Sequence, residues 1–257
     1  MRMLLTVFCC ACLWLAGEAC GAAPEPAAAD PLRSPLWSGM QQRFFEGQRV
    51  VFDDRVQVRM PEAAEDSLNV PVEISAEGFD RIERILVFAD LNPIPKILEF
   101  QPGQARPRLA FRLKVEQSTP VRAAVLDGDG TWHVGGAWIS AAGGGCTMPS
   151  VGAGSPIWQE RIGEVAARQW TPFEGGGSRL RFRVIHPMDT GLAAGIPVFH
   201  LEDVRILTEA GDTLARLALY EPVSENPVIS LDFDYVGPVR VEGRDTQGNQ
   251  VSARVTP

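Results

Sequence analysis

The residue in this chain best suited to covalent chemistry is Cys146, a cysteine that follows three consecutive glycines. The chain has five cysteines, and the other four lie within its first 20 residues: Cys9, Cys10, Cys12 and Cys20. Removal of that segment would leave a single thiol that has no partner for an intramolecular disulfide. A lone cysteine in an exported protein is either a reactive thiol or an intermolecular partner.

The segment around the thiol predicts a flexible carrier loop over residues 143–156. Gly143, Gly144 and Gly145 precede the cysteine and small Thr147 follows it, so the backbone can extend and enter a narrow slot. At about 3.3 Å per extended residue, the thiol could stand roughly 15 Å from the body of the protein. We expect this segment to display the thiol instead of packing it into a core. The alternative is a glycine linker that carries an incidental cysteine.

The sequence around Cys146 does not predict a self-contained catalyst. A catalytic cysteine is normally held beside a histidine, but His133, His186 and His200 are all distant from it in sequence. No neighbouring lysine or arginine lowers the pKa of its thiol. Soft sulfur from Cys146 and Met148, together with the last two histidines, would suit copper. The alternative is that these histidines only form hydrogen bonds within the fold.

The composition and the N-terminus indicate an exported globular protein. The chain has 257 residues, a formal net charge of −8 and 45% hydrophobic residues, a balance that argues against a nucleic-acid surface. Residues 1–23 combine a positive start, a short apolar run and small residues, as a secretory signal peptide does. We expect cleavage after Ala22 or Ala23, a periplasmic location and no membrane span afterwards. No P-loop, dinucleotide fingerprint, HExxH motif or serine nucleophile elbow occurs.

The first half of the chain predicts a β-sandwich. Residues 24–49 form a leader, disordered up to Ser34, followed by a short helix whose apolar residues recur at helical spacing from Pro35 to Phe45. From Val50 the pattern has a period of two, which is typical of half-buried antiparallel strands. Turn residues separate six or seven such runs over 50–142, a spacing that favours an immunoglobulin-like sandwich.

The second half predicts a smaller sandwich of the same kind. Residues 157–178 are interpreted as a short helix or a linker, and a second series of alternating strands occupies 179–257. Three turn sequences punctuate the two halves and indicate hairpins: Asp127-Gly128-Asp129-Gly130, Glu209-Ala210-Gly211-Asp212 and Asp245-Thr246-Gln247-Gly248-Asn249. The fold class is therefore expected to be all-β, with two sandwiches joined by the glycine-rich loop.

Particular motifs in both halves resemble a known carrier family. The first half resembles SoxY, the sulfur-carrier subunit of the bacterial sulfur-oxidation system, and the second half resembles its partner SoxZ. The SoxY-like motifs are Met60–Asp66, Asn69–Val72, Val87–Pro95 and the glycine-cysteine segment 143–146; the SoxZ-like motifs are His186–Gly191, Glu225–Pro227 and Asp245–Gly248. Their order is similar to that of fused SoxYZ-like carriers associated with quinoprotein dehydrogenases.

The resemblance implies a non-enzymatic periplasmic carrier that needs no cofactor. Cys146 would hold a sulfur intermediate as a covalent adduct, as in thiosulfate oxidation, and present it to partner enzymes. Those partners would be sulfur-oxidation enzymes or a quinoprotein dehydrogenase system. One departure from the family stands out: Thr147-Met148-Pro149 and a further domain follow the cysteine, whereas the family arm usually ends its chain. The alternatives are a redox or accessory binding module for a quinoprotein dehydrogenase, and a copper-binding protein.

Overall fold

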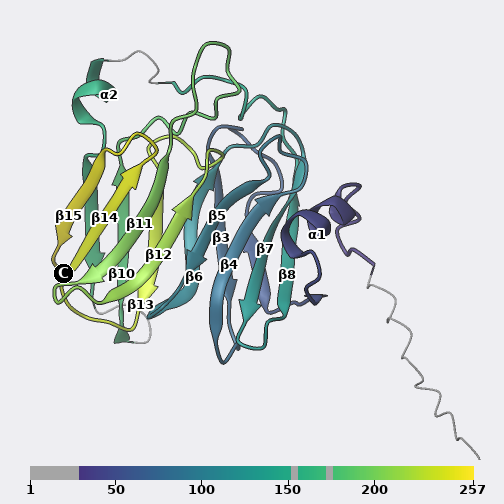
Figure 1. Cartoon of the computed structure of the whole chain (residues 1–257), viewed down its shortest axis with the longest axis horizontal. Coiled ribbons are helices and arrows are strands. Elements are labelled where there is room, and N and C mark those ends of the chain that lie inside the picture. Colours follow the sequence, from purple (N-terminus) through teal and green to yellow (C-terminus); the bar gives the residue numbers. More distant parts are fainter. Residues whose placement is uncertain (1–28, 152–155, 172–175) are drawn as a thin grey trace, which may run out of the picture.

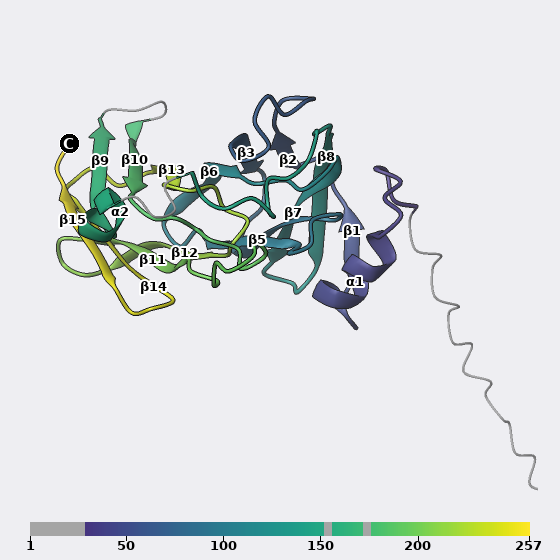
Figure 2. The ribbon, with the colours of Figure 1, turned by 90° about the horizontal axis from the view of Figure 1, so that it is seen from above.

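The computed structural model describes residues 29–151, 156–171 and 176–257, and this part of the chain is a two-layered β-sandwich (Figures 1 and 2). One sheet has nine strands in the order β1 (Val50–Phe52), β8 (Trp132–Ile139), β7 (Thr119–Asp127), β4 (Ile82–Ala89), β5 (Lys96–Gln101), β12 (Thr213–Leu219), β11 (Leu201–Thr208), β14 (Val239–Asp245) and β15 (Gln250–Val255). The other has six, in the order β2 (Val56–Arg59), β3 (Val70–Ala76), β6 (Ala105–Leu113), β13 (Val228–Phe233), β10 (Ser178–Val184) and β9 (Val165–Trp170).

Alternation of apolar and polar residues explains why these segments form strands with one buried face. In β10, Leu180, Phe182 and Val184 point into the core, and Arg181 and Arg183 between them are exposed. Successive side chains of a strand point to opposite faces of the sheet, so this pattern buries one face and solvates the other. The predicted all-β fold of the sandwich class is confirmed, and the two predicted sandwiches are joined through both sheets and not only by the glycine-rich loop.

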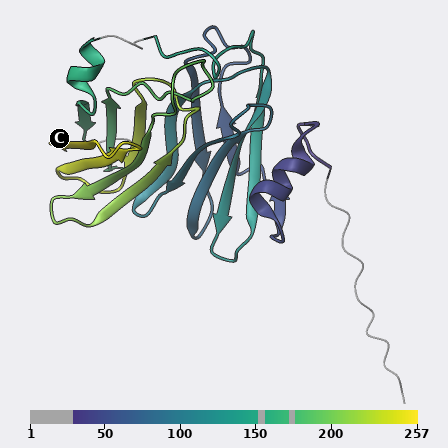
Figure 3. The same ribbon diagram turned by 45° about the horizontal axis from the view of Figure 1, so that its top comes forward.

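The two halves of the chain share both sheets. Strand β5 of the first half pairs antiparallel with β12 of the second, which places Leu98 opposite Leu219. In the other layer β6 pairs with β13, with Leu109 opposite Leu231. Buried residues of both halves accordingly form one hydrophobic cluster. Figures 1 and 3 show the blue-to-teal half and the green-to-yellow half side by side in one continuous sandwich.

Two strands differ from the sequence prediction. The short strand β5 lies between Pro95 and Pro102, where the sequence pattern predicted no strand. Strand β9 lies within the predicted linker 157–178, after helix α2 (Pro156–Arg161), and pairs along its whole length with β10. Only part of that linker therefore connects the halves, since β9 is an edge strand of the six-stranded sheet.

The N-terminal segment packs on the outside of the nine-stranded sheet. Helix α1 (Trp37–Phe45), which the apolar spacing predicted, buries Trp37, Met40 and Phe45 in a second cluster against that sheet. Asp30 pairs with buried Arg122 at 2.7 Å, so the leader is not disordered over its described residues. The predicted signal peptide lies outside the described residues. Among those described, no helix is long and apolar enough to span a membrane.

Candidate functional site

Cys146 is fully buried, which corrects the expectation of a displayed thiol on a flexible arm. Its exposed fraction is 0%, and the neighbouring Gly145 is buried as well, whereas Thr147, Met148 and Pro149 face solvent. The Gly144 carbonyl accepts a hydrogen bond from the Met148 N–H at 3.1 Å, which closes a single turn around the cysteine. The thiol therefore lies on the inner side of a compact turn.

The carboxylate of Glu116 holds this turn in place. One of its oxygens accepts hydrogen bonds from the backbone N–H groups of Cys146 and Thr147, at 3.0 and 3.1 Å. The Thr147 hydroxyl lies 3.1 Å from the other oxygen and donates to the same carboxylate. Hydrogen bonds to an ionised acceptor are stronger than neutral ones. Glu116 thus connects the end of the β6 region to the cysteine turn across 30 positions of sequence.

The glycines before the cysteine allow close contact with neighbouring backbone. A Cβ atom on Gly145 would lie 2.2 Å from the Ser67 carbonyl oxygen and 2.5 Å from that of Val115, distances that no side chain tolerates. Gly143 and Gly144 have φ values of +107° and +85°, where a side chain is strained. The glycines that predicted a mobile arm therefore let the segment pack tightly.

The second half of the chain supplies the other wall of the site. The Thr190 hydroxyl donates a 2.6 Å hydrogen bond to the Cys146 carbonyl. Two residues earlier, the carbonyl of buried Met188 accepts a hydrogen bond from the Lys114 ammonium. The Lys114 carbonyl in turn lies 3.7 Å from the Cys146 sulfur. The cysteine is therefore enclosed between the residues that follow β6 in the first half and the loop that carries Met188 and Thr190 in the second half.

Asn92 organises the backbone on the SoxY-like side. Its side-chain amide donates to the Lys114 carbonyl and accepts from the Glu116 N–H, both at 2.9 Å. Asn92 is buried and belongs to the motif Val87–Pro95 that carries the family resemblance. A single amide thus fixes the backbone of Lys114 and Glu116, two of the residues that contact the cysteine turn.

Burial dominates the electrostatics of the site. Loss of solvent raises the pKa of the Cys146 thiol to about 12, although Lys114 opposes this change. The same desolvation lowers the pKa of the Lys114 ammonium to about 8, although charge on Cys146 and nearby acids opposes it. At neutral pH the site therefore combines a neutral thiol with a buried cation.

His186, Met188 and Asn226 build the loop of the second half that faces the cysteine. His186 is buried and its ring accepts a 3.1 Å hydrogen bond from the Met188 N–H. The His186 N–H donates to the side-chain oxygen of Asn226, and the Asn226 N–H donates to the His186 carbonyl. Met188 and Asn226 have positive φ values of 54° and 46°, an uncommon conformation for residues other than glycine. Asp245 caps its own hairpin turn and lies 3.5 Å from His186. These residues hold the loop that presents Thr190.

The residues considered for copper do not form a ligand set. His186 lies inside the loop just described, His200 lies 3.7 Å from Glu221, and Met148 is 54% exposed while Cys146 is buried. Within residues 29–151, 156–171 and 176–257, no group of three histidine, cysteine, aspartate or glutamate side chains could hold a metal ion.

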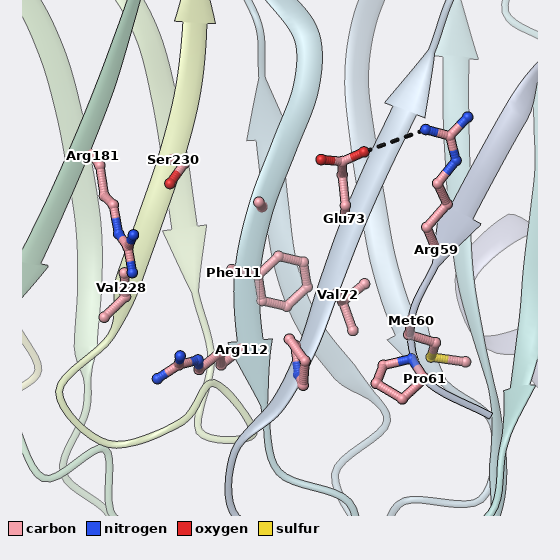
Figure 4. A pocket seen from close by; sticks show the side chains of 12 residues that line it. Arg59, Met60, Pro61, Val72, Glu73, Phe111, Arg112, Arg181, Val228 and Ser230 are labelled. Carbon is pink, nitrogen blue, oxygen red and sulfur yellow. Dashed lines mark ion pairs between the residues drawn. The ribbon is translucent and has the colours of Figure 1, made fainter. Parts of the chain in front are cut away.

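An open groove of about 520 Å³ crosses the outer face of the six-stranded sheet (Figure 4). Arg112 and Arg181 lie along it, and Arg59 forms an ion pair with Glu73 at 3.6 Å. Cys146 is not among the residues that line it. The groove is therefore separate from the cysteine site.

Sequence reasoning found the cysteine and missed its surroundings. Lys114, Glu116 and Thr190 were not predicted as site residues. Asn92 and Thr190 lie within quoted family motifs, which is the one signal that could have drawn attention to them. The composition could also have drawn attention to Lys114, because it and Lys96 are the only two lysines in a chain whose other basic residues, apart from histidine, are arginines.

Comparisons with known proteins agree with the resemblance over the first half of the chain. The family model described as sulfur oxidation protein SoxY matches residues 41–146. No curated protein sequence matches the chain.

Solved structures with weak overall similarity include three proteins. The sulfur carrier protein SoxY from Chlorobium limicola f thiosulfatophilum is 18% identical, with a TM-score of 0.37 over 42% of this chain and 96% of that one. The superoxide reductase (neelaredoxin) from Ignicoccus hospitalis is 18% identical, with a TM-score of 0.32 over 36% and 94%. A tetra-tandem repeat of a large adhesion protein is 11% identical, with a TM-score of 0.27 over 79% and 48%. The family match thus ends at the buried cysteine.

Proposed function

We propose that this protein is a periplasmic sulfur carrier, in which Cys146 binds a sulfur-compound intermediate covalently and presents it to partner enzymes. The observation that carries the proposal is the SoxY family match over residues 41–146, whose last residue is the cysteine itself. The partners would be enzymes of sulfur oxidation or, as the fused order of the halves suggests, a quinoprotein dehydrogenase system. The chain itself would catalyse no turnover.

The carrier would alternate between a closed and an open position of the cysteine turn. In the closed position the thiol is shielded, and its raised pKa keeps it protonated and unreactive. The turn is held by the hydrogen bonds that Glu116 accepts from it, by the hydrogen bond that Thr190 donates to it and by the packing of its glycines. A partner that displaces these contacts would release the thiol without disturbing the sheets.

Loading from thiosulfate would form a sulfur–sulfur bond at Cys146. The thiol and thiosulfate would give the cysteine S-thiosulfonate and one proton, and two electrons would pass to the partner redox enzyme. The thiolate is the species that forms such bonds. Opening of the turn would therefore need to precede loading, since the closed site disfavours the thiolate.

Intact-mass analysis of the protein from thiosulfate-grown cells tests the proposal. We expect a mass increase that corresponds to a sulfur adduct, that is removed by dithiothreitol and that is absent from Cys146→Ser. Absence of any adduct with substrate and partners present would contradict it. Full function of Cys146→Ser in a strain that lacks the native protein would instead favour an accessory binding module.

A further inference from the structure

Lys114 is a buried cation without an anionic partner in the described structure. Its exposed fraction is 5%, and its ammonium donates to one backbone carbonyl, that of Met188. Among the described residues no carboxylate lies within 4.0 Å of it, and the Met188 carbonyl is the hydrogen-bond acceptor that it has there. Burial of an ammonium without a counterion is strongly unfavourable. Such an arrangement is expected where an anion is present for part of the time.

The other lysine shows what a satisfied environment looks like in this chain. Lys96 pairs with Glu99 and lies 4.5 Å from the ring centre of Tyr220. These contacts raise its pKa in spite of burial, whereas desolvation lowers that of Lys114 to about 8. The lowered pKa of Lys114 is therefore caused by its own surroundings, and it is not a general property of buried lysines in this protein.

Cys146 is the neighbour of Lys114 whose charge can change. The cysteine sulfur lies 3.7 Å from the Lys114 carbonyl, and the ammonium and the Cys146 carbonyl are bonded to the same loop, at Met188 and Thr190 respectively. Glu116 also carries a charge at this turn, but three hydrogen bonds to Cys146 and Thr147 direct its carboxylate to that backbone. Asp189, Glu221 and Glu225 favour the ammonium through their charge alone, and none of them forms an ion pair with it within 4.0 Å.

We propose that Lys114 is the charge partner of an anionic sulfur group on Cys146, so that the closed site retains anionic adducts in preference to neutral ones. A thiosulfonate or persulfide on the cysteine carries a negative charge, whereas the buried thiol is neutral. The adduct would complete a buried ion pair with an ammonium that is already in place. This role deepens the proposed carrier function and rests on it for its biological meaning.

Matched adducts on Cys146 test the charge preference without any partner enzyme. Attack of the Cys146 thiolate on tetrathionate forms the anionic S-thiosulfonate and releases thiosulfate, with the thiol proton lost to solvent. Attack on methyl methanethiosulfonate forms the neutral methyl disulfide and releases methanesulfinate. Protein lacking residues 1–23 carries no other cysteine, so each reagent gives a single product.

The quantity measured is the pKa of Lys114, which NMR determines in protein labelled at the lysine ε-carbons. With lysines only at 96 and 114, the spectrum holds two side-chain signals, and Lys96→Gln assigns them. We expect the anionic adduct to raise the pKa of Lys114 by about one unit or more, roughly a tenfold change in its proton affinity, because an opposite charge favours the ammonium. The neutral adduct should leave this pKa within a few tenths of a unit of that in the free thiol form.

An equal shift with both adducts would overturn the inference, since it would mean that modification merely exposes Lys114 to solvent. An unchanged pKa with the anionic adduct would overturn it as well. As a second measurement, dithiothreitol should release the thiosulfonate at least tenfold faster from Lys114→Gln than from the native sequence, while release of the methyl group changes by less than threefold. Failure of the carrier function would appear separately, as cells that never load Cys146.

Discussion

At the residue scale, the chemistry of Cys146 is decided by groups that lie far from it in sequence. Lys114 and Glu116 are 32 and 30 positions away, and Thr190 is 44 positions away. Together they bury the sulfur, fix its backbone and place a cation nearby. An apparently bare thiol on a glycine-rich segment thus becomes a protected one.

The first prediction concerns thiol reactivity in protein that lacks residues 1–23. The pKa of Cys146 rises from 9.0 to about 12 in the folded state, so the thiolate fraction at pH 8 should fall roughly a thousandfold. We expect Cys146 to react with 5,5′-dithiobis(2-nitrobenzoic acid) at least that much more slowly in the native protein than in guanidinium chloride. Native reaction within tenfold of the unfolded rate would show that the closed turn does not protect the thiol.

The pKa of Lys114 changes in the opposite direction and has the opposite effect on stability. Because its folded pKa of about 8 lies below the ordinary 10.5, its contribution is most favourable above pH 10.5 and declines as the pH falls towards 8. For Cys146 the folded pKa is raised, so its contribution is complete below pH 9 and declines as the pH rises towards 12. The two groups therefore oppose each other between pH 9 and 10.5.

At the element scale, the cysteine turn is attached to the sandwich mainly by side-chain hydrogen bonds and not by strand pairing. Residues 141–149 belong to no strand. The segment is connected to the residues after β6 by the Glu116 side chain and by two backbone hydrogen bonds, from Gly144 and Gly145, and to the second half by Thr190. The sheets on either side can keep their pairing when these bonds break. Opening of the turn is thus a local event.

The second prediction concerns the Glu116 carboxylate. Glu116→Ala removes its hydrogen bonds to Cys146 and Thr147, each worth about 1.5–3 kcal/mol when the acceptor is ionised. We expect the reaction of Cys146 with a disulfide reagent to become roughly tenfold or more faster under native conditions. The melting temperature should fall by no more than closure of the turn contributes, because the sheets keep their strand pairing when the turn opens.

Glu65→Ala is the matched control, since Glu65 is an exposed carboxylate on a neighbouring loop with no hydrogen bond among the described residues. Equal thiol reactivity in the two variants would show that Glu116 does not hold the turn closed.

At the scale of the whole molecule, the two halves form one folding unit around a shared core. Pairing of β5 with β12 and of β6 with β13 continues both sheets across the boundary between the halves. The cysteine site lies at that boundary, because Lys114 follows β6 and donates its N–H to the Pro222 carbonyl of the second half. Closure of the site therefore depends on the joined halves.

The third prediction concerns cooperativity. Leu98 and Leu219 face each other across the boundary with exposed fractions of 0% and 1%, and replacement of either by alanine should cost about 2–5 kcal/mol. We expect a single calorimetric unfolding transition whose midpoint temperature falls in each variant, with equal calorimetric and van't Hoff enthalpies. Two transitions, with each substitution lowering a different one, would show that the halves unfold independently.

The sequence alone determined the local features of this protein. The period of two in segments such as Leu180–Val184 follows from the pleat of a strand, and the Asp-Gly turn after Asp127 follows from backbone sterics, so both are visible in any single stretch of residues. The motifs with family resemblance and Cys146 are likewise local, and the SoxY family match agrees with those motifs that lie within residues 41–146.

Only the tertiary structure decided what surrounds the cysteine. Strand β5 has a short apolar pattern between prolines and becomes a strand because β4 and β12 flank it. Gly145 indicated a flexible backbone in sequence, but carbonyl oxygens of Ser67 and Val115 occupy the space that its missing side chain leaves. Burial of Cys146 and the placement of Lys114 likewise depend on packing between residues distant in sequence. Such contacts have no local period that a sequence could reveal.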